Sequence, residues 1–173
     1  MRARTFALMA LLLALPLAAH GQDFKPFASS DGRYKIQFPG TPKTATTDVA
    51  SGKDTLKLTI DSVELKGDIS FAVSHIDASE EVSKRPPGPR LEKVRDAVKG
   101  ENGKVLEDKE VTLSLGDAKF TGRDVVLETP NGFLRNRMVI VERRLYQVMV
   151  QGSKEVVTSE TADKFINSFE LTK

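Results

Sequence analysis

The sequence predicts an α+β fold in which an antiparallel β-sheet meander is covered by helices. Three observations support this prediction. Apolar and polar residues alternate in several short segments, the period of half-buried strands. Turns rich in glycine, proline and asparagine separate these segments, which favours antiparallel connections. Two other stretches, near the middle of the chain and near its C-terminus, carry apolar residues at helical spacing instead.

The N-terminus has the composition of a secretory signal peptide. Arg2 and Arg4 precede an apolar run over residues 6–17, and small residues follow before Gln22. The apolar run is shorter than the roughly 20 residues that a membrane-spanning helix needs. We therefore expect cleavage before Gln22. This divides the chain into a signal peptide over residues 1–21 and a single α+β domain over residues 22–173, with no stable membrane anchor after cleavage.

Charge and cysteine content exclude several classes of protein. Removing Arg2 and Arg4 lowers the number of lysines and arginines from 26 to 24, which equals the 24 aspartates and glutamates. A neutral domain without a basic stripe is unlike a nucleic-acid binder. The chain has no cysteine, which excludes disulfides, cysteine-ligated zinc, a thiol nucleophile and a lipoprotein anchor. We expect an exported protein of the periplasm or the extracellular space.

The first half of the predicted domain contains strand-like segments in a meander. They are residues 34–38, 44–49, 56–65 and 69–73. The second is polar enough to lie at a sheet edge. In the third, the apolar positions change parity between Ile60 and Val63, which predicts a bulge or bend. An exposed connection over residues 78–88 then leads into a helix from Pro89 to Lys99, because proline suits the first helical position.

The second half repeats this order. Predicted strands cover residues 104–115, 118–128, 133–141 and 145–151. Residues 129–132 form the clearest hairpin turn in the chain. A last helix is predicted from Ser159 to Ser168, with Thr158 or Ser159 as the N-cap. We interpret its apolar stripe, from Ala162 to Phe169, as a core-facing surface.

His75 invites a hydrolytic interpretation, because Ser74 and Asp77 lie beside it. Catalysis by these three groups requires them to converge, whereas neighbours on one strand point to opposite faces of the sheet. We therefore predict no catalytic residue. One histidine without cysteine also makes a poor transition-metal site, and no calcium-loop motif is present, so we predict no metal and no cofactor.

Arg123, Arg135 and Arg137 are the candidate binding residues for an anion or a partner. They fall on consecutive predicted strands joined by the hairpin, and Arg135 and Arg137 share one face. Guanidinium groups bind carboxylates and phosphates strongly. The hairpin leaves two registers open, with Glu128 opposite Arg135 or Asp124 opposite Arg137. In either register a cross-strand ion pair would account for the arginines without any ligand.

The order of turns and core residues is similar to that of a known group of proteins. The stretches that carry the similarity are Gly32 to Pro42, Phe120 to Asp124, Leu145 to Val148 and Phe165 to Phe169. They resemble small exported bacterial proteins of unassigned function and, through these, the PsbP-type fold shared by the photosystem II extrinsic subunit PsbP and the periplasmic protein DcrB. The resemblance implies an antiparallel sheet between helices, an α/β/α sandwich, without a common catalytic centre. It also implies binding to partner proteins or membrane complexes.

These observations predict an exported, non-enzymatic binding or accessory domain that interacts with an envelope protein. The chain lacks the lipidation cysteine of DcrB-like proteins, so the resemblance does not extend to a membrane tether. The alternative is a small-ligand or anion-binding carrier that uses the arginine-bearing face of the sheet. A third interpretation, a hydrolase around His75, requires loss of activity when that residue is replaced.

Overall fold

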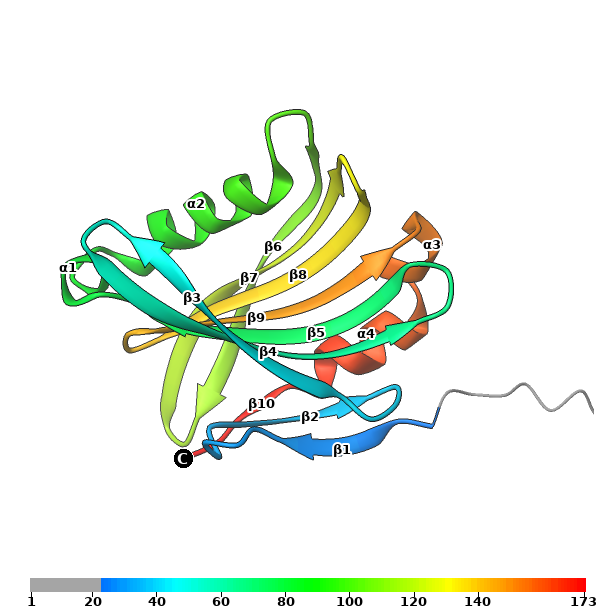
Figure 1. Ribbon diagram of the computed structural model, residues 1–173, viewed down its shortest axis with the longest axis horizontal. Helices are drawn as coiled ribbons and strands as arrows, with labels where there is room; N and C mark the ends of the chain where they lie inside the picture. Colours follow the sequence, from blue (N-terminus) through cyan, green and yellow to red (C-terminus); the bar gives the residue numbers. More distant parts are fainter. Residues whose placement is uncertain (1–22) are drawn as a thin grey trace, which may run out of the picture.

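A computed structural model describes residues 23–173, which form two antiparallel sheets and four helices (Figure 1). The predicted signal peptide over residues 1–21 lies outside this part of the chain. The large sheet contains, in spatial order, β3 (Lys43–Ser51), β4 (Asp54–Leu65), β5 (Ile69–Asp77), β9 (Arg144–Gly152), β8 (Gly132–Val141), β7 (Ala118–Thr129) and β6 (Lys104–Leu115). The small sheet contains β1 (Lys25–Ala28), β2 (Tyr34–Phe38) and β10 (Glu170–Leu171).

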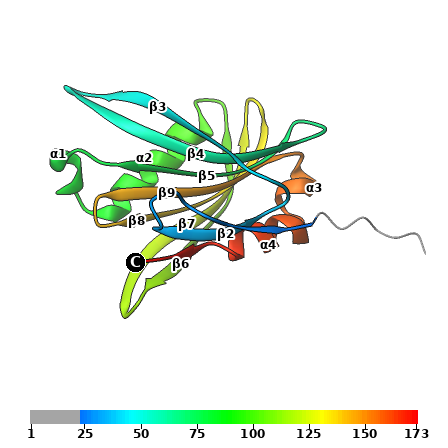
Figure 2. The ribbon, with the colours of Figure 1, turned by 60° about the horizontal axis from the view of Figure 1, so that its bottom comes forward.

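The helices cover the two faces of the large sheet unequally. Short helix α1 (Glu80–Ser83) leads into α2 (Pro87–Lys99), which packs on β7 and β8. On the opposite face lie α3 (Lys154–Val157) and α4 (Glu160–Asn167), together with the small sheet (Figures 1 and 2). We call the two sides the α2 face and the α4 face. Among the described residues, no helix is long and apolar enough to cross a membrane.

The main core lies on the α4 face, where aromatic side chains join the two sheets. Phe165 of α4 is fully buried, and its ring centre lies 5.2 Å from that of Phe38 in β2 and 5.2 Å from that of Phe71 in β5. The hydroxyl of Tyr34 in β2 donates a hydrogen bond to the buried carboxylate of Asp61 in β4. The small sheet is therefore fixed to the large one by both apolar and polar contacts.

The predicted fold class is confirmed, but the first predicted strand joins a different sheet. Residues 34–38 form β2, which pairs with β1 and β10 rather than with the strand that follows it. The strands of the large sheet are two meanders, β3-β4-β5 and β9-β8-β7-β6, joined where β5 pairs with β9. As predicted, the polar segment at residues 44–49 lies at an edge of the sheet.

The bulge predicted between Ile60 and Val63 is wrong. β4 pairs with β3 and with β5 without any shift in register. Its apolar positions change parity because the two faces are apolar in different halves of the strand: Val63 joins the main core, whereas Ile60 faces the α2 side. A register shift occurs instead in β6, between Val105 and Glu107.

The β7–β8 hairpin takes one of the two registers that the sequence left open. Thr129 pairs with Gly132, so Pro130 and Asn131 form the loop and Asp124 lies opposite Arg137. Proline suits this position, because its fixed φ matches the first central residue of a turn and it has no N–H to donate to the ladder.

The predicted helices are confirmed, whereas two single-turn helices were not predicted. Ser159 is the N-cap of α4, and its side chain accepts a hydrogen bond from the backbone N–H of Ala162. Helix α2 begins at Pro87, two residues before the predicted start. The short helices α1 and α3 contain four residues each, too few for a periodic pattern to show in the sequence.

Replacing Phe165 by alanine should lower the free energy of unfolding by about 3–5 kcal/mol, the usual cost of truncating a large aromatic residue in a core. Urea unfolding measures the loss. Glu160→Ala, at an exposed position of the same helix, is the control and should change the stability by no more than about 0.5 kcal/mol. A similar stability for both variants would contradict the role of Phe165 in joining the sheets.

Candidate functional site

The three candidate arginines do not form a single site. Arg123 lies on the α2 face of β7, whereas Arg135 and Arg137 lie on the α4 face of β8. The Nε of Arg123 donates a hydrogen bond of 2.8 Å to Asp108 in β6, and Asp108 also accepts one of 2.7 Å from Arg95 in α2. Arg123 therefore belongs to an ion network that fixes α2 against β6 and β7.

Arg135 and Arg137 share one buried carboxylate. Asp124 accepts hydrogen bonds of 3.1 Å from both Nε and Nη2 of Arg135. It also accepts bonds of 3.2 and 2.8 Å from Nε and Nη2 of Arg137. Burial alone would raise the pKa of Asp124, but the hydrogen bonds from the two arginines outweigh this effect and lower it. The carboxylate is therefore ionised at neutral pH.

The remaining donors of these two arginines reach α4. Arg135 Nη1 donates to Asp163 at 2.5 Å. Arg137 Nη1 donates to the backbone carbonyl of Ile166 at 3.1 Å, and its Nη2 donates to the side chain of Asn167 at 3.0 Å. The carbonyl belongs to the last turn of the helix, where backbone acceptors have no partner within the helix. The pair therefore connects β8 to both ends of α4.

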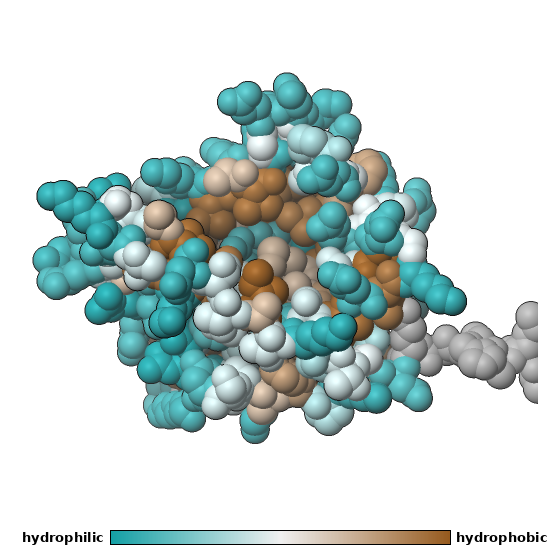
Figure 3. Space-filling view, in the orientation of Figure 1, coloured by the Kyte–Doolittle hydropathy of each residue, from teal (hydrophilic) through white to brown (hydrophobic). Residues whose placement is uncertain are grey.

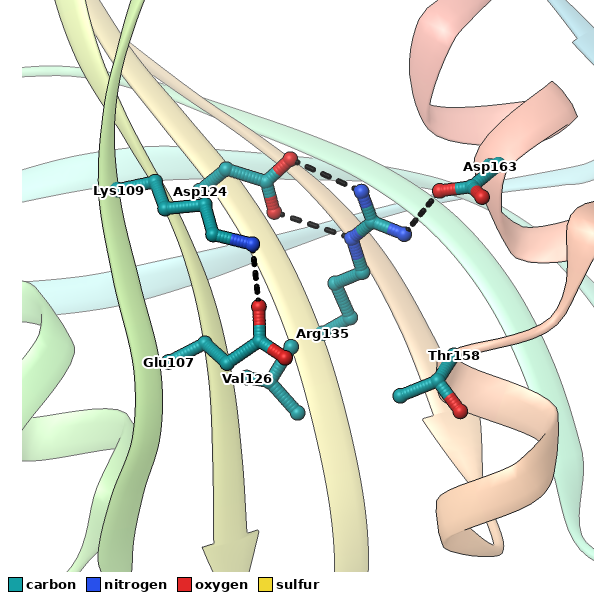
Figure 4. A pocket seen from close by; sticks show the side chains of 7 residues that line it. All are labelled: Glu107, Lys109, Asp124, Val126, Arg135, Thr158 and Asp163. Atoms are coloured by element: carbon teal, nitrogen blue, oxygen red, sulfur yellow. Dashed lines mark hydrogen bonds and ion pairs between the residues drawn. The ribbon is translucent and has the colours of Figure 1, made fainter.

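A polar pocket of about 210 Å³ lies beside Arg135, between β6, β7 and the segment containing α3 and α4 (Figure 4). Besides Asp124, Arg135 and Asp163, Glu107, Lys109, Val126 and Thr158 line it. Lys109 donates to Glu107 at 2.6 Å, so each cation in the pocket already has a carboxylate. An anion entering this pocket would lie beside the carboxylates of Glu107, Asp124 and Asp163, which repel it.

The residues around His75 do not converge. Ser74 is buried on the α2 face, while His75 lies on the α4 face among the rings of Tyr34 and Tyr146. Asp77 forms an ion pair with Arg144, with Nε 2.7 Å from Oδ1. Burial, followed by the charge of Arg144, lowers the pKa of His75. The geometry therefore provides no serine–histidine contact.

A second candidate surface, which the sequence did not single out, lies on the α2 face. Helix α2 covers β7 and β8 there, and no other element of residues 23–173 packs extensively on this face of β4 and β5. Partly buried apolar side chains occupy these strands and neighbouring β9, and we call this surface the open face: Leu56, Leu58, Ile60, Ile76, Leu145 and Met149. Figure 3 shows apolar side chains gathered in a band on this side of the molecule, with hydrophilic residues around it.

The centre of the open face is a row of residues that runs across the strands. Leu58 is paired with Ile76, and Ile76 is paired with Leu145. The row continues beneath α2, because Leu145 is paired with the buried Ile140. The sequence did contain one indication of the open face. The apolar positions change parity within residues 56–65, which indicates a strand that is apolar on both sides.

A line of polar side chains borders this row. Asn136 Nδ2 donates to Gln147 at 2.9 Å, and Gln147 Nε2 lies 3.5 Å from the hydroxyl of Ser74. Asn136 is fully buried, and its Oδ1 has no hydrogen-bond partner among the described residues. Polar groups inside an otherwise apolar layer fix the relative positions of the strands that carry them. Within the described residues, no group of three or more histidine and acidic side chains could hold a metal ion.

Comparison with solved structures establishes the fold. The chain is similar to the cyanobacterial PsbP protein CyanoP from Synechocystis sp. PCC 6803, with a TM-score of 0.52 and 9% sequence identity. The alignment covers 92% of this chain and 98% of the cyanobacterial one. The protein thus has a PsbP-like α+β fold. No protein-family model matches the sequence, and no curated protein matches it.

Replacing Asp124 by asparagine should destabilise the protein by about 3–5 kcal/mol at neutral pH, because two guanidinium groups would lose the carboxylate that compensates them. The folded-state pKa of Asp124 is depressed, so its contribution is present above the unfolded value of about 3.9 and is lost as the pH falls through the lower folded value. Urea unfolding at several pH values should therefore show the difference between wild type and D124N narrowing below about pH 4. A difference that does not depend on pH would contradict this assignment.

Proposed function

We propose that this protein is an exported, non-enzymatic accessory domain that binds an envelope protein through its open face. The observation that carries the proposal is the uncovered row of Leu58, Ile76 and Leu145. Contiguous exposed apolar surface on a soluble domain marks sites of interaction. Half-exposed side chains on rigid strands also lose little conformational entropy when a partner covers them.

The shape of the open face favours a macromolecular partner over a small ligand. The apolar row crosses three neighbouring strands and lies open on the side away from α2. Polar residues border it, including Ser62, Glu64 and Ser70 on the same face. An apolar centre with a polar rim is the usual arrangement of a protein–protein interface, whereas small molecules bind in concave sites that enclose most of their surface.

The arrangement of the polar side chains supports a role without catalysis. Ser74 and His75 lie on opposite faces of β5, and Asp77 is held by Arg144. Export is supported by the signal-peptide pattern over residues 1–21. The anion-carrier alternative has less support, because the donors of Arg123, Arg135 and Arg137 already contact protein acceptors.

Site-specific photo-crosslinking in the envelope fraction tests the proposal. A photoreactive amino acid placed at Leu58 should give a discrete crosslinked adduct, because this position lies at the centre of the open face. The same amino acid placed at Thr55, which is exposed on the opposite side of the same strand, is the matched control and should give none.

A substitution should remove the same adduct. Ile60→Asp, combined with the crosslinker at Leu58, introduces a charge into the apolar surface and should reduce the yield at least about tenfold, equivalent to about 1.4 kcal/mol of binding free energy. Thermal unfolding verifies that the variant is folded. Equal adducts from Leu58 and Thr55, or only uncrosslinked monomer from both, would contradict the proposal.

A further inference from the structure

The two edges of the large sheet are built differently. Edge strand β6 is interrupted by a register shift between Val105 and Glu107 and carries charged residues at Lys104 and over 107–110. Bulges and charges on an edge prevent further strands from pairing with it. Edge strand β3 carries two charged residues, Lys43 and Asp48, and its nine residues, KTATTDVAS, pair with β4 without a shift and include no proline. It therefore lacks the register shift and the run of charges that protect β6, and we call β3 the unprotected edge.

The outer side of β3 has a regular set of backbone groups available for pairing. Ser51 and Asp54 close a two-residue hairpin, with Gly52 at a φ of 64°, so they form a hydrogen-bonded pair. Because such pairs alternate along an antiparallel ladder, the odd-numbered residues of β3 bond to β4. The N–H and C=O groups of Thr44, Thr46, Asp48 and Ala50 therefore point away from the sheet. β4 is the element on which β3 packs extensively, and β3 forms the rim in Figure 2.

We propose that β3 pairs with β3 of a second copy of this chain, antiparallel and centred on Thr47. In this register all nine residues are paired, from Lys43 opposite Ser51 of the other copy to Ser51 opposite Lys43. Neither charged residue of β3 lies opposite a charged residue of the other copy. Lys43 lies opposite Ser51, and Asp48 lies opposite Thr46. Like charges placed directly opposite would be destabilising, and this register has none.

Pairing between two copies gives β3 of each molecule a partner strand, so neither unprotected edge stays open. A two-fold contact is closed, because the same strand of each copy takes part in it. The joined sheet then ends on β6 at both sides, where the bulge and the charges stop further addition. Ala45 faces Val49 of the other copy on the α2 side, so the two open faces become neighbours across the new pair.

Because the natural chain has no cysteine, a single introduced cysteine gives a direct test. In the proposed register, Thr47 lies opposite Thr47 of the other copy in a non-hydrogen-bonded pair. The Cα atoms of such a pair are about 4.5 Å apart, within the range of about 4.4–6.8 Å that a disulfide accepts. Full-length mature Thr47→Cys should therefore form a disulfide-linked dimer under mild oxidation.

Two cysteine variants serve as matched controls. Thr44→Cys would place its sulfur about 20 Å from the same residue of the other copy, at about 3.3 Å per residue, so it should remain monomeric. Thr112→Cys lies at an exposed position on the protected edge β6 and should also remain monomeric. Efficient crosslinking of all three variants would indicate random collision and would overturn the proposal, as would crosslinking at Thr44 alone.

A proline variant tests the same contact without oxidation. Thr46→Pro removes an outward N–H and leaves the pairing with β4 intact, so it should abolish the dimer while the monomer stays folded. Thr112→Pro, an outward position on β6 by the same alternation from the Leu115–Ala118 pair, should dimerise like the wild type. Sedimentation over about 10 µM to 1 mM measures the association, because contacts made only along an edge are weak. A wild type that stays monomeric throughout, or a dimer unaffected by Thr46→Pro, would overturn the proposal, and pairing of β3 only with a different protein would do the same.

Discussion

The architecture depends on the antiparallel pairing of β5 with β9. This pairing joins two meanders that would otherwise be separate sheets. It runs from Ser70 opposite Gln151 to Asp77 opposite Arg144. It also brings together residues far apart in the sequence, which costs loop-closure entropy that burial must offset. On the α4 face, Phe71 and Val73 from β5 meet Val148 and Val150 from β9, and this surface is the base on which α4 and the small sheet pack.

The same pairing explains why one face is covered only in part. Between β5 and β6 the chain crosses the α2 face once, and α2 is the long helix of that crossing. The network of Arg95, Asp108 and Arg123 holds α2 toward the β6 side. Helix α2 therefore covers β7 and β8, and β4 and β5 remain uncovered. The open face follows from where one helix is fixed, and two of its residues, Leu145 and Met149, join it to the core beneath α2.

Local patterns predicted the elements well because most of the information about them is local. Alternation located the strands of the second half to within one or two residues, and the serine N-cap located α4. The position of β2 was not predictable in this way. Its partners are β1 and the C-terminal β10, where Tyr34 is paired with Leu171, and no periodicity within a segment reveals such a distant contact.

The candidate site was predictable only as far as strand parity allows. Parity placed Arg135 and Arg137 on one face, and the structure places them together around Asp124. Arg123 was grouped with them because it lies on a neighbouring strand, but its pairing with Met138 puts it on the opposite face. Either register gives this separation, because both pair Arg123 with an even-numbered residue of β8; the register decides only which acid lies opposite which arginine.

The parity change within β4 is the clearest case in which a pattern was detected and its cause misread. A bulge and a strand that is apolar on both faces give the same sequence of apolar positions, because each moves the apolar residues from one parity to the other. Only the pairing with β3 and β5 distinguishes them, and both ladders are continuous. The uncovered apolar residues and the unprotected edge consequently lie on adjacent strands, whereas the charged and bulged edge lies at the other end of the sheet. The half that contains β3 and β4 is thus the part of the sheet whose continuous ladder and apolar face favour association.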